Sequence, residues 1–122
     1  MADFLIAAFD ETRWQMVPAE LERQVRAGWP QAEVWLAEER VSFTIPREDG
    51  YAIDGGLDRG AGAVALDAGL ADSAAFAAWY REQVPPEQEL HFFDEGATFT
   101  IVLEPGVSAA EIVRQAEAQW RS

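Results

Sequence analysis

Short segments of the chain alternate between hydrophobic and polar residues, whereas others are hydrophobic at every third or fourth position. The continuous apolar run at residues 4–9 predicts a buried strand. Residues 33–45 alternate with period two, and so do residues 90–103, which is typical of strands with one buried face. Residues 62–67 form another apolar run of strand length. We therefore expect strands along most of the chain, arranged partly as hairpins.

Three segments have helical periodicity. Residues 18–29 begin with a proline and are apolar at every fourth position, which predicts a short amphipathic helix. Residues 76–84 carry a second apolar stripe, for which we expect Asp72 or Ser73 as the N-cap. Ser108 with a glutamate three residues later is typical of a capping box, and it predicts a C-terminal helix over residues 108–121.

The two predicted hairpins have related sequences. Residues 33–50 align without gaps on residues 89–106, and seven of the eighteen positions are identical. Each hairpin follows a helix, and each helix follows a strand ending in aspartate. We therefore expect an α+β fold built as a single domain over residues 1–122. In it, a duplicated β-α-β-β unit, approximately residues 3–50 and 60–106, forms one mostly antiparallel sheet with helices packed on one face, plus the C-terminal helix.

The turn of the first hairpin can be predicted from its register. Only an even-length loop keeps the apolar residues of both strands on one face. A two-residue loop made of Glu38 and Glu39 is disfavoured, because such loops prefer residues that tolerate positive φ. We therefore expect a four-residue loop.

Counting residues 51–53 as a further short strand completes a β-α-β-β-β unit. Paired units of this kind, at this length, resemble the vicinal-oxygen-chelate fold of glyoxalases and bleomycin-resistance proteins. That family holds a metal with histidine and glutamate, and this chain has no histidine near either first strand of the repeat. The second unit also ends in a helix instead of a strand. No residue role is carried over from the resemblance.

The net charge of the chain limits the kinds of partner that it can bind. The chain has 22 acidic residues and nine basic ones, all arginine, for a net charge of −13. Residues 33–104 hold fifteen of the acids and four of the arginines, a net of −11. Such a chain would be repelled by nucleic acids and by anionic membranes. The absence of cysteine fits a cytoplasmic protein, and the arginine-only, alanine-rich composition is typical of GC-rich bacteria.

One candidate site is a small-ligand or catalytic cleft around the only histidine, His91. By strand parity, His91 points away from the core together with Thr98 and Thr100, and the equivalent position in the first unit is Trp35. A histidine there could act as an acid or a base. The plainer interpretation, which we favour, is a half-exposed strand residue hydrogen-bonded to a threonine.

A second candidate site consists of paired carboxylates at the two hairpin loops, Glu38 with Glu39 and Asp94 with Glu95. Two such loops lying close together could bind a divalent cation. Because adjacent acids at turns are more often simply solvated, we expect no metal site and no cofactor.

Tryptophan is frequent, with five residues. Trp29, Trp79 and Trp120 fit the helix stripes and are expected in the core, whereas Trp14 and Trp35 do not fit. Exposed aromatic residues beside acidic ones are typical of protein-binding surfaces.

We therefore expect a non-enzymatic, acidic protein-binding module with a basic protein partner, of which an immunity-type inhibitor of a toxin or nuclease is one example. Trp35 and the loop acids Glu38, Glu39, Asp94 and Glu95 are expected at its interface. Two alternatives stay open. One is a small-ligand protein or minor enzyme at His91, and the other is a structural protein that forms a homodimer instead of acting as a monomer.

Overall fold

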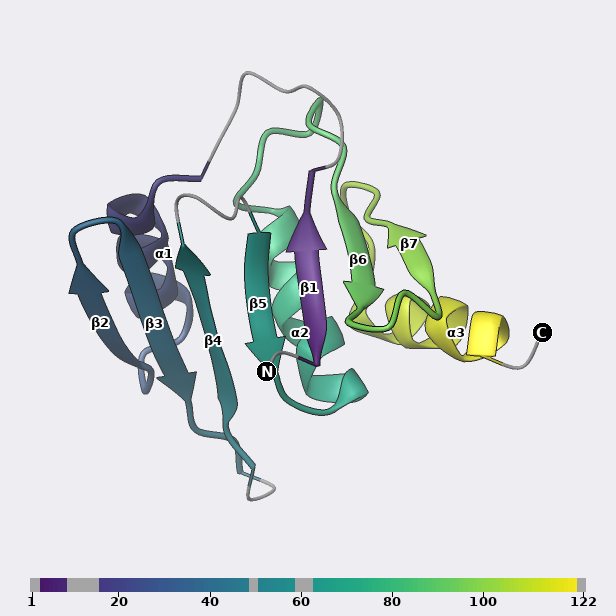
Figure 1. The fold of residues 1–122 in the computed structure, drawn as a ribbon, viewed down its shortest axis with the longest axis horizontal. Coiled ribbons are helices and arrows are strands. Elements are labelled where there is room, and N and C mark those ends of the chain that lie inside the picture. The colour runs from purple at the N-terminus through teal and green to yellow at the C-terminus, as the bar shows by residue number, and fades with distance from the viewer. Residues whose placement is uncertain (1–2, 9–15, 49–50, 59–62, 121–122) are drawn as a thin grey trace.

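The computed structural model describes residues 3–8, 16–48, 51–58 and 63–120. Within these residues the chain forms one seven-stranded antiparallel sheet and three helices, one of them C-terminal (Figure 1). The elements in chain order are β1 (Phe4–Ala7), α1 (Pro18–Gly28), β2 (Glu33–Ala37), β3 (Arg40–Ile45), β4 (Ile53–Asp58), β5 (Ala63–Asp67), α2 (Leu70–Arg81), β6 (His91–Asp94), β7 (Thr100–Val102) and α3 (Ala109–Trp120). The α+β class and the antiparallel sheet are confirmed.

The strands lie in the order β2-β3-β4-β5-β1-β6-β7, so β2 and β7 form the edges. Seen from the side drawn in Figure 1, the three helices lie behind the sheet. Helix α1 contacts β2 and β3, α2 contacts β1, and α3 contacts β7 and α2. Alternate residues of the strands point toward this layer and are buried, as Phe43 and Phe92 show. The opposite face, toward the viewer, we call the open face, since none of the described helices packs on it.

The first strand is placed far from the rest of its predicted unit. Strand β1 lies between β5 and β6, both of which come from the second half of the chain. It is separated from β3 by β4 and β5. In the second segment, only β1 separates β5 from β6. The first strand of each predicted unit therefore lies at a different distance from the hairpin of the same unit. The duplication of the unit stays a prediction.

The first hairpin has a two-residue turn, so the expected four-residue loop is wrong. Ala37 pairs with Arg40, which leaves only Glu38 and Glu39 between the strands. Neither glutamate has a positive φ. Arg40 also pairs with β4, so the long β3–β4 ladder extends β3 to the turn. Pairing with a neighbouring strand has overridden the local preference for residues that tolerate positive φ.

Strand β4 is longer than the sequence indicated, since it covers residues 53–58 instead of the expected 51–53. Glycine suits this strand where a neighbouring side chain packs closely against its backbone. A Cβ on Gly55 would lie 2.6 Å from the ring of Phe43 on the neighbouring strand. The phenylalanine ring therefore occupies the space that a side chain on Gly55 would need.

Helix α2 begins one turn earlier than expected. Its N-cap is Gly69, and neither Asp72 nor Ser73 has that role. Ser73 is buried, and its hydroxyl donates to the carbonyl of Ala68 at 3.3 Å. The apolar stripe is as expected, because Phe76 and Tyr80 are both buried in the core.

Arg81, at the end of α2, is the largest fully buried side chain, with 1% of its surface exposed. Its guanidinium donates to the backbone carbonyls of Gln88 at 2.7 Å, Pro85 at 2.5 Å, Val84 at 3.3 Å and Leu103 at 3.4 Å. Burial lowers the pKa of Arg81, and nearby carboxylates oppose this. One cation thus connects the segment after α2 to Leu103, the residue that follows β7.

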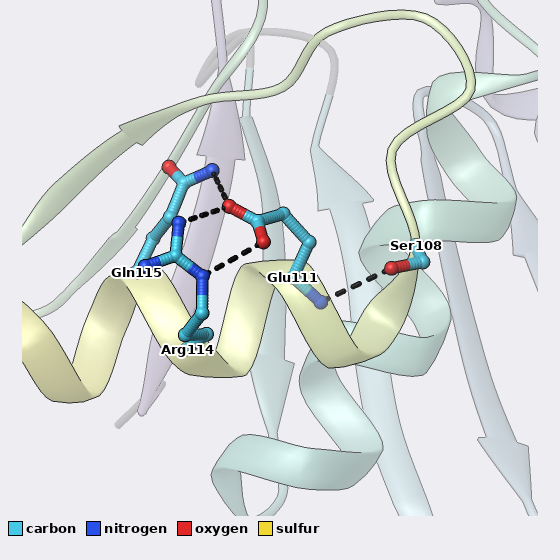
Figure 2. Close-up of polar contacts among 4 residues, drawn as sticks. All are labelled: Ser108, Glu111, Arg114 and Gln115. Atoms are coloured by element: carbon cyan, nitrogen blue, oxygen red, sulfur yellow. Dashed lines mark hydrogen bonds and ion pairs between the residues drawn. The ribbon is translucent and has the colours of Figure 1, made fainter.

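Helix α3 starts as the sequence indicated. The hydroxyl of Ser108 accepts a hydrogen bond from the backbone N–H of Glu111 at 3.1 Å (Figure 2). The carboxylate of Glu111 accepts from Arg114 and Gln115 in the next turn, at 2.8 Å in each case. These side-chain bonds lower the pKa of Glu111 to about 2, with Arg114 as the main cause.

Replacing Ser108 with alanine should lower the free energy of unfolding by about 1 kcal/mol, because the N–H of Glu111 loses its acceptor. Urea denaturation followed by circular dichroism measures this. Ser108→Asn, which preserves a capping oxygen, is the matched control and should lie within about 0.5 kcal/mol of wild type. Equal losses in both variants would contradict a capping role for Ser108.

Candidate functional site

The two acidic loops lie at opposite corners of the sheet. Glu38 and Glu39 form the turn between β2 and β3, whereas Glu95 follows Asp94 at the end of β6 (Figure 1). Strands β2 and β6 are five positions apart in the strand order, which corresponds to roughly 24 Å at about 4.8 Å per strand. These loops therefore cannot share a cation. Across the described ranges, no group of three or more potential ligands could hold a metal ion.

Asp94 organises its own loop. Its carboxylate accepts hydrogen bonds from the N–H of Thr98 at 2.7 Å and of Phe99 at 3.2 Å, and from the Thr98 hydroxyl. Burial alone would raise the pKa of Asp94, but these donors outweigh it and the pKa is lowered. The hydroxyl of Thr98 in turn accepts from the indole N–H of Trp120 at 2.9 Å. Asp94 and Thr98 therefore have structural partners at this loop.

The structure separates Trp35 from the other residues of the predicted ligand cleft. The side chain of His91 is 14% exposed and its Nε2 lies 3.1 Å from a carboxylate oxygen of Glu89. Its strand neighbours are Ala7 and Val102. Trp35 lies on β2, at the far edge of the sheet. A site combining His91 with Trp35 would have to span the strands between them.

The structure assembles another group of carboxylates, of which the sequence analysis named only Glu95. Across the neighbouring strands, Glu33 pairs with Thr44, Thr44 with Asp54, and Asp54 with Asp67. The same line continues across β1, because the N–H of Asp3 donates to Leu66 at 2.9 Å and its carbonyl accepts from Glu95 at 3.1 Å. We call this line of exposed carboxylates the acidic row. Its members are Glu33, Asp54, Asp67, Asp3 and Glu95.

Asp3 interacts with its neighbours in the acidic row. Its pKa is raised, chiefly because its carboxyl shares a hydrogen bond with Asp67, and further by burial and by the charges of Asp67 and Glu95. A carboxyl beside other carboxylates retains its proton more strongly. Asp54 is held by the Thr44 hydroxyl, which donates to it at 2.7 Å.

Most of the described arginines have partners away from the acidic row. Those on α1 and α3 pair with glutamates of their own helix, Arg47 lies 3.2 Å from Asp72, and Arg81 is buried. Arg40 lies at the turn end of β3, whereas Thr44 lies at the end that crosses the acidic row. The row is therefore a source of negative potential that these arginines do not neutralise.

An exposed aromatic residue borders the acidic row. Trp35 follows Glu33 by two residues, so both point to the open face, and Trp35 is 55% exposed. Trp29 and Trp79 pack against the core, but Trp120 is 47% exposed, so its expected core position is wrong. Trp120 lies at the end of α3 and contacts Phe99 edge-on at the surface. Trp14 lies outside the described residues.

A cleft of about 570 Å³ lies between the start of α1 and the segment after α2. Its lining combines apolar and amide side chains with Glu20 and Glu82. It contains no histidine or arginine, and none of the predicted site residues lines it. We do not assign a ligand to this cleft.

None of the helices in the described segments is long and apolar enough to cross a membrane. No model of a known protein family, no curated protein and no solved structure matches this chain. The function must therefore be argued from the site itself.

Proposed function

We propose that this chain is a non-enzymatic, acidic protein-binding module, and that its partner presents a basic surface to the acidic row. The observation that carries the proposal is the alignment of five exposed carboxylates across six strands of one sheet. Such a line of like charges accelerates the approach of an oppositely charged protein and selects it over other proteins. An immunity-type inhibitor of a basic bacterial toxin or nuclease in the cytoplasm is one protein of this kind.

The energetics of the row support binding over a purely structural role. Side-by-side carboxylates repel one another, and the charges of Asp67 and Glu95 contribute to the raised pKa of Asp3, so this repulsion opposes folding at neutral pH. A basic partner would relieve this repulsion on binding. The exposed indole of Trp35 beside Glu33 adds apolar contact area of the kind that protein interfaces use.

The alternative of a ligand site or minor enzyme at His91 has less support. His91 pairs with Glu89, and its strand neighbours are an alanine and a valine, with no nucleophile beside it in either register. If His91 were the functional residue, His91→Ala would abolish ligand binding and leave the melting temperature unchanged. We expect instead a lower melting temperature, because the mostly buried imidazole would be replaced by a smaller side chain.

To test the proposal, the partner is first captured on this protein from a lysate of the source organism at low salt. It is then released by a salt gradient. The test variant neutralises the row as Glu33→Gln/Asp54→Asn/Asp67→Asn. The matched control, Glu38→Gln/Glu39→Gln/Glu117→Gln, removes the same number of charges from exposed positions outside the row. Stopped-flow or surface-based kinetics then compare the association rates.

We expect the row variant to associate at least about tenfold more slowly at low ionic strength, and the control only about twofold more slowly. The difference should shrink in roughly 0.5 M salt, where the Debye length falls to a few ångströms. Equal slowing in both variants would show that overall charge alone attracts the partner. Failure to recover any basic protein would overturn the proposed function.

A further inference from the structure

Strand β2 has an unpaired edge. It is the first strand of the sheet order, and among the described strands it pairs with β3 alone. In a two-residue hairpin the pair that flanks the turn, here Ala37 with Arg40, exchanges hydrogen bonds, and the pairs alternate from there. The backbone groups of Val34 and Leu36 therefore point outward, away from β3. Arg26 supports this geometry, because its guanidinium donates to the outward carbonyl of Val34 at 3.0 Å.

The opposite edge of the sheet is covered by its own helix. The side-chain amide of Gln119 accepts from the N–H of Thr100 at 3.0 Å and donates to the Thr100 carbonyl at 2.9 Å. An amide that bonds both backbone groups of one residue occupies the place of a neighbouring strand. This blocks further pairing at β7. The molecule therefore offers β2 as its edge for strand addition.

The side chains of β2 are unusually apolar for an exposed edge. Trp35 is 55% exposed on the open face, and Leu36 is 43% exposed on the opposite face. Native edge strands are normally protected by charged residues or proline. Among the described residues, Glu33, the charged turn and the contact from Arg26 give β2 some protection.

We propose that β2 pairs antiparallel with β2 of a second copy of this chain, in the register centred on Trp35. This register places Val34 opposite Leu36 of the second copy, so their outward groups can exchange hydrogen bonds on both sides of the two-fold axis. It also places the two Trp35 residues opposite each other and Glu33 opposite Ala37. The register joins two sheets into one and puts no like charges opposite each other within the strands.

Charge disfavours the neighbouring register that is shifted toward the turn. A register centred on Leu36 would place Glu33 opposite Glu39 and Val34 opposite Glu38, which costs both repulsion and apolar contact. Helix α1, which packs behind β2, carries two glutamates and two arginines and adds no net charge at this edge. A second copy is therefore tolerated at the β2 edge despite the strong negative charge of the whole chain.

This pairing shares Trp35 with the proposed surface for the basic partner, but it has the opposite dependence on salt. Two copies of a chain with net charge −13 repel each other, so added salt should strengthen the dimer. Binding of a basic partner should weaken in the same salt. In the dimer the acidic rows remain exposed, because the pairing uses the edge of β2 and not the end of the sheet.

The test is sedimentation velocity over about 5–500 µM protein, at low and at high salt. If the chain self-associates, its sedimentation coefficient rises with protein concentration. Leu36→Pro removes the outward N–H that the second copy needs and leaves the β2–β3 hydrogen bonds intact. Val102→Pro is the matched control on the covered edge, since Val102 is similarly exposed and belongs to the same outward set as Thr100. Circular dichroism verifies that each variant is folded.

We expect Leu36→Pro to raise the dissociation constant of the dimer about 30-fold, since two hydrogen bonds are lost per dimer, and Val102→Pro to leave it unchanged.

Should either proline variant unfold, Trp35→Glu provides the test by placing two glutamates face to face at the two-fold axis. Arg26→Ala should tighten the dimer, because the Val34 carbonyl becomes free.

Hydrogen exchange gives a second readout. The amides of Val34 and Leu36 should become protected as protein concentration rises. A chain that remains monomeric across the whole range would overturn the proposal. A dimer that Val102→Pro disrupts and Leu36→Pro does not would equally overturn it, because it would form through the other edge.

Discussion

Replacing Arg81 with methionine should lower the free energy of unfolding by about 3–5 kcal/mol. The guanidinium is 1% exposed and is hydrogen-bonded to four backbone carbonyls. Methionine fills part of the space but donates nothing, so these carbonyls would stay buried without donors. Arg81→Lys preserves the charge but not the planar fork that reaches four acceptors, and its loss should be intermediate.

The control for Arg81→Met is Arg114→Met, which removes the same charge from the exposed face of α3. It should cost at most about 0.5 kcal/mol, the value of an exposed pair within one helix. Chemical denaturation of both variants in one buffer makes the comparison. If the two variants lost similar amounts of stability, the carbonyl network around Arg81 would be contributing little.

Asp67→Asn should raise the melting temperature at neutral pH by about 2–5 °C, because it removes a carboxylate that lies beside two others in the acidic row. The asparagine amide can also donate to Asp3. Because Asp67 belongs to the row, the same change should weaken association with a basic partner. A gain in stability with a loss of binding is the pattern expected where residues are retained for function.

The pH dependence follows from the titration of Asp3. Its pKa is raised in the folded protein, so the folded state holds this proton to higher pH than the unfolded chain does. The stabilising effect of that proton is present at acidic pH and is lost as the pH rises through the folded-state pKa. The advantage of Asp67→Asn should therefore be largest at neutral pH and shrink at acidic pH, where Asp3 holds its proton.

Thermal unfolding at several pH values measures this dependence, with Glu38→Gln as the control. Glu38 is exposed at the far turn and lies outside the acidic row, so its neutralisation should shift the melting temperature much less. An equal gain from both variants would indicate relief of overall charge instead of relief within the row. An unchanged melting temperature in Asp67→Asn would show that these carboxylates do not repel one another measurably.

Local signals in the sequence predicted local structure well. Ser108 caps α3, and the stripe of Phe76 and Tyr80 faces the core, because both features depend on residues only a few positions apart. Local reasoning was wrong where a neighbouring strand intervened. The β2–β3 turn and strand β4 follow pairing with strands that the local pattern did not include.

The candidate site shows the same division. The sequence indicated that negative charge is concentrated in residues 33–104 and that Trp35 lies off the core face. It could not indicate that Asp3 meets Asp67 and Glu95, because that depends on β1 lying between β5 and β6. Strand parity determines which face a residue occupies, but not which residue of a distant strand lies beside it.

The sequence by itself therefore determined the α+β class, the helices, the alternation of the strands and the acidic character of the protein. The tertiary structure alone decided the strand order, and with it the acidic row, the covered edge at Gln119 and the open edge at β2. The physical reason is that periodicity and capping arise from contacts between near neighbours in the chain. The order and register of distant strands depend instead on the packing of the whole sheet against its helices.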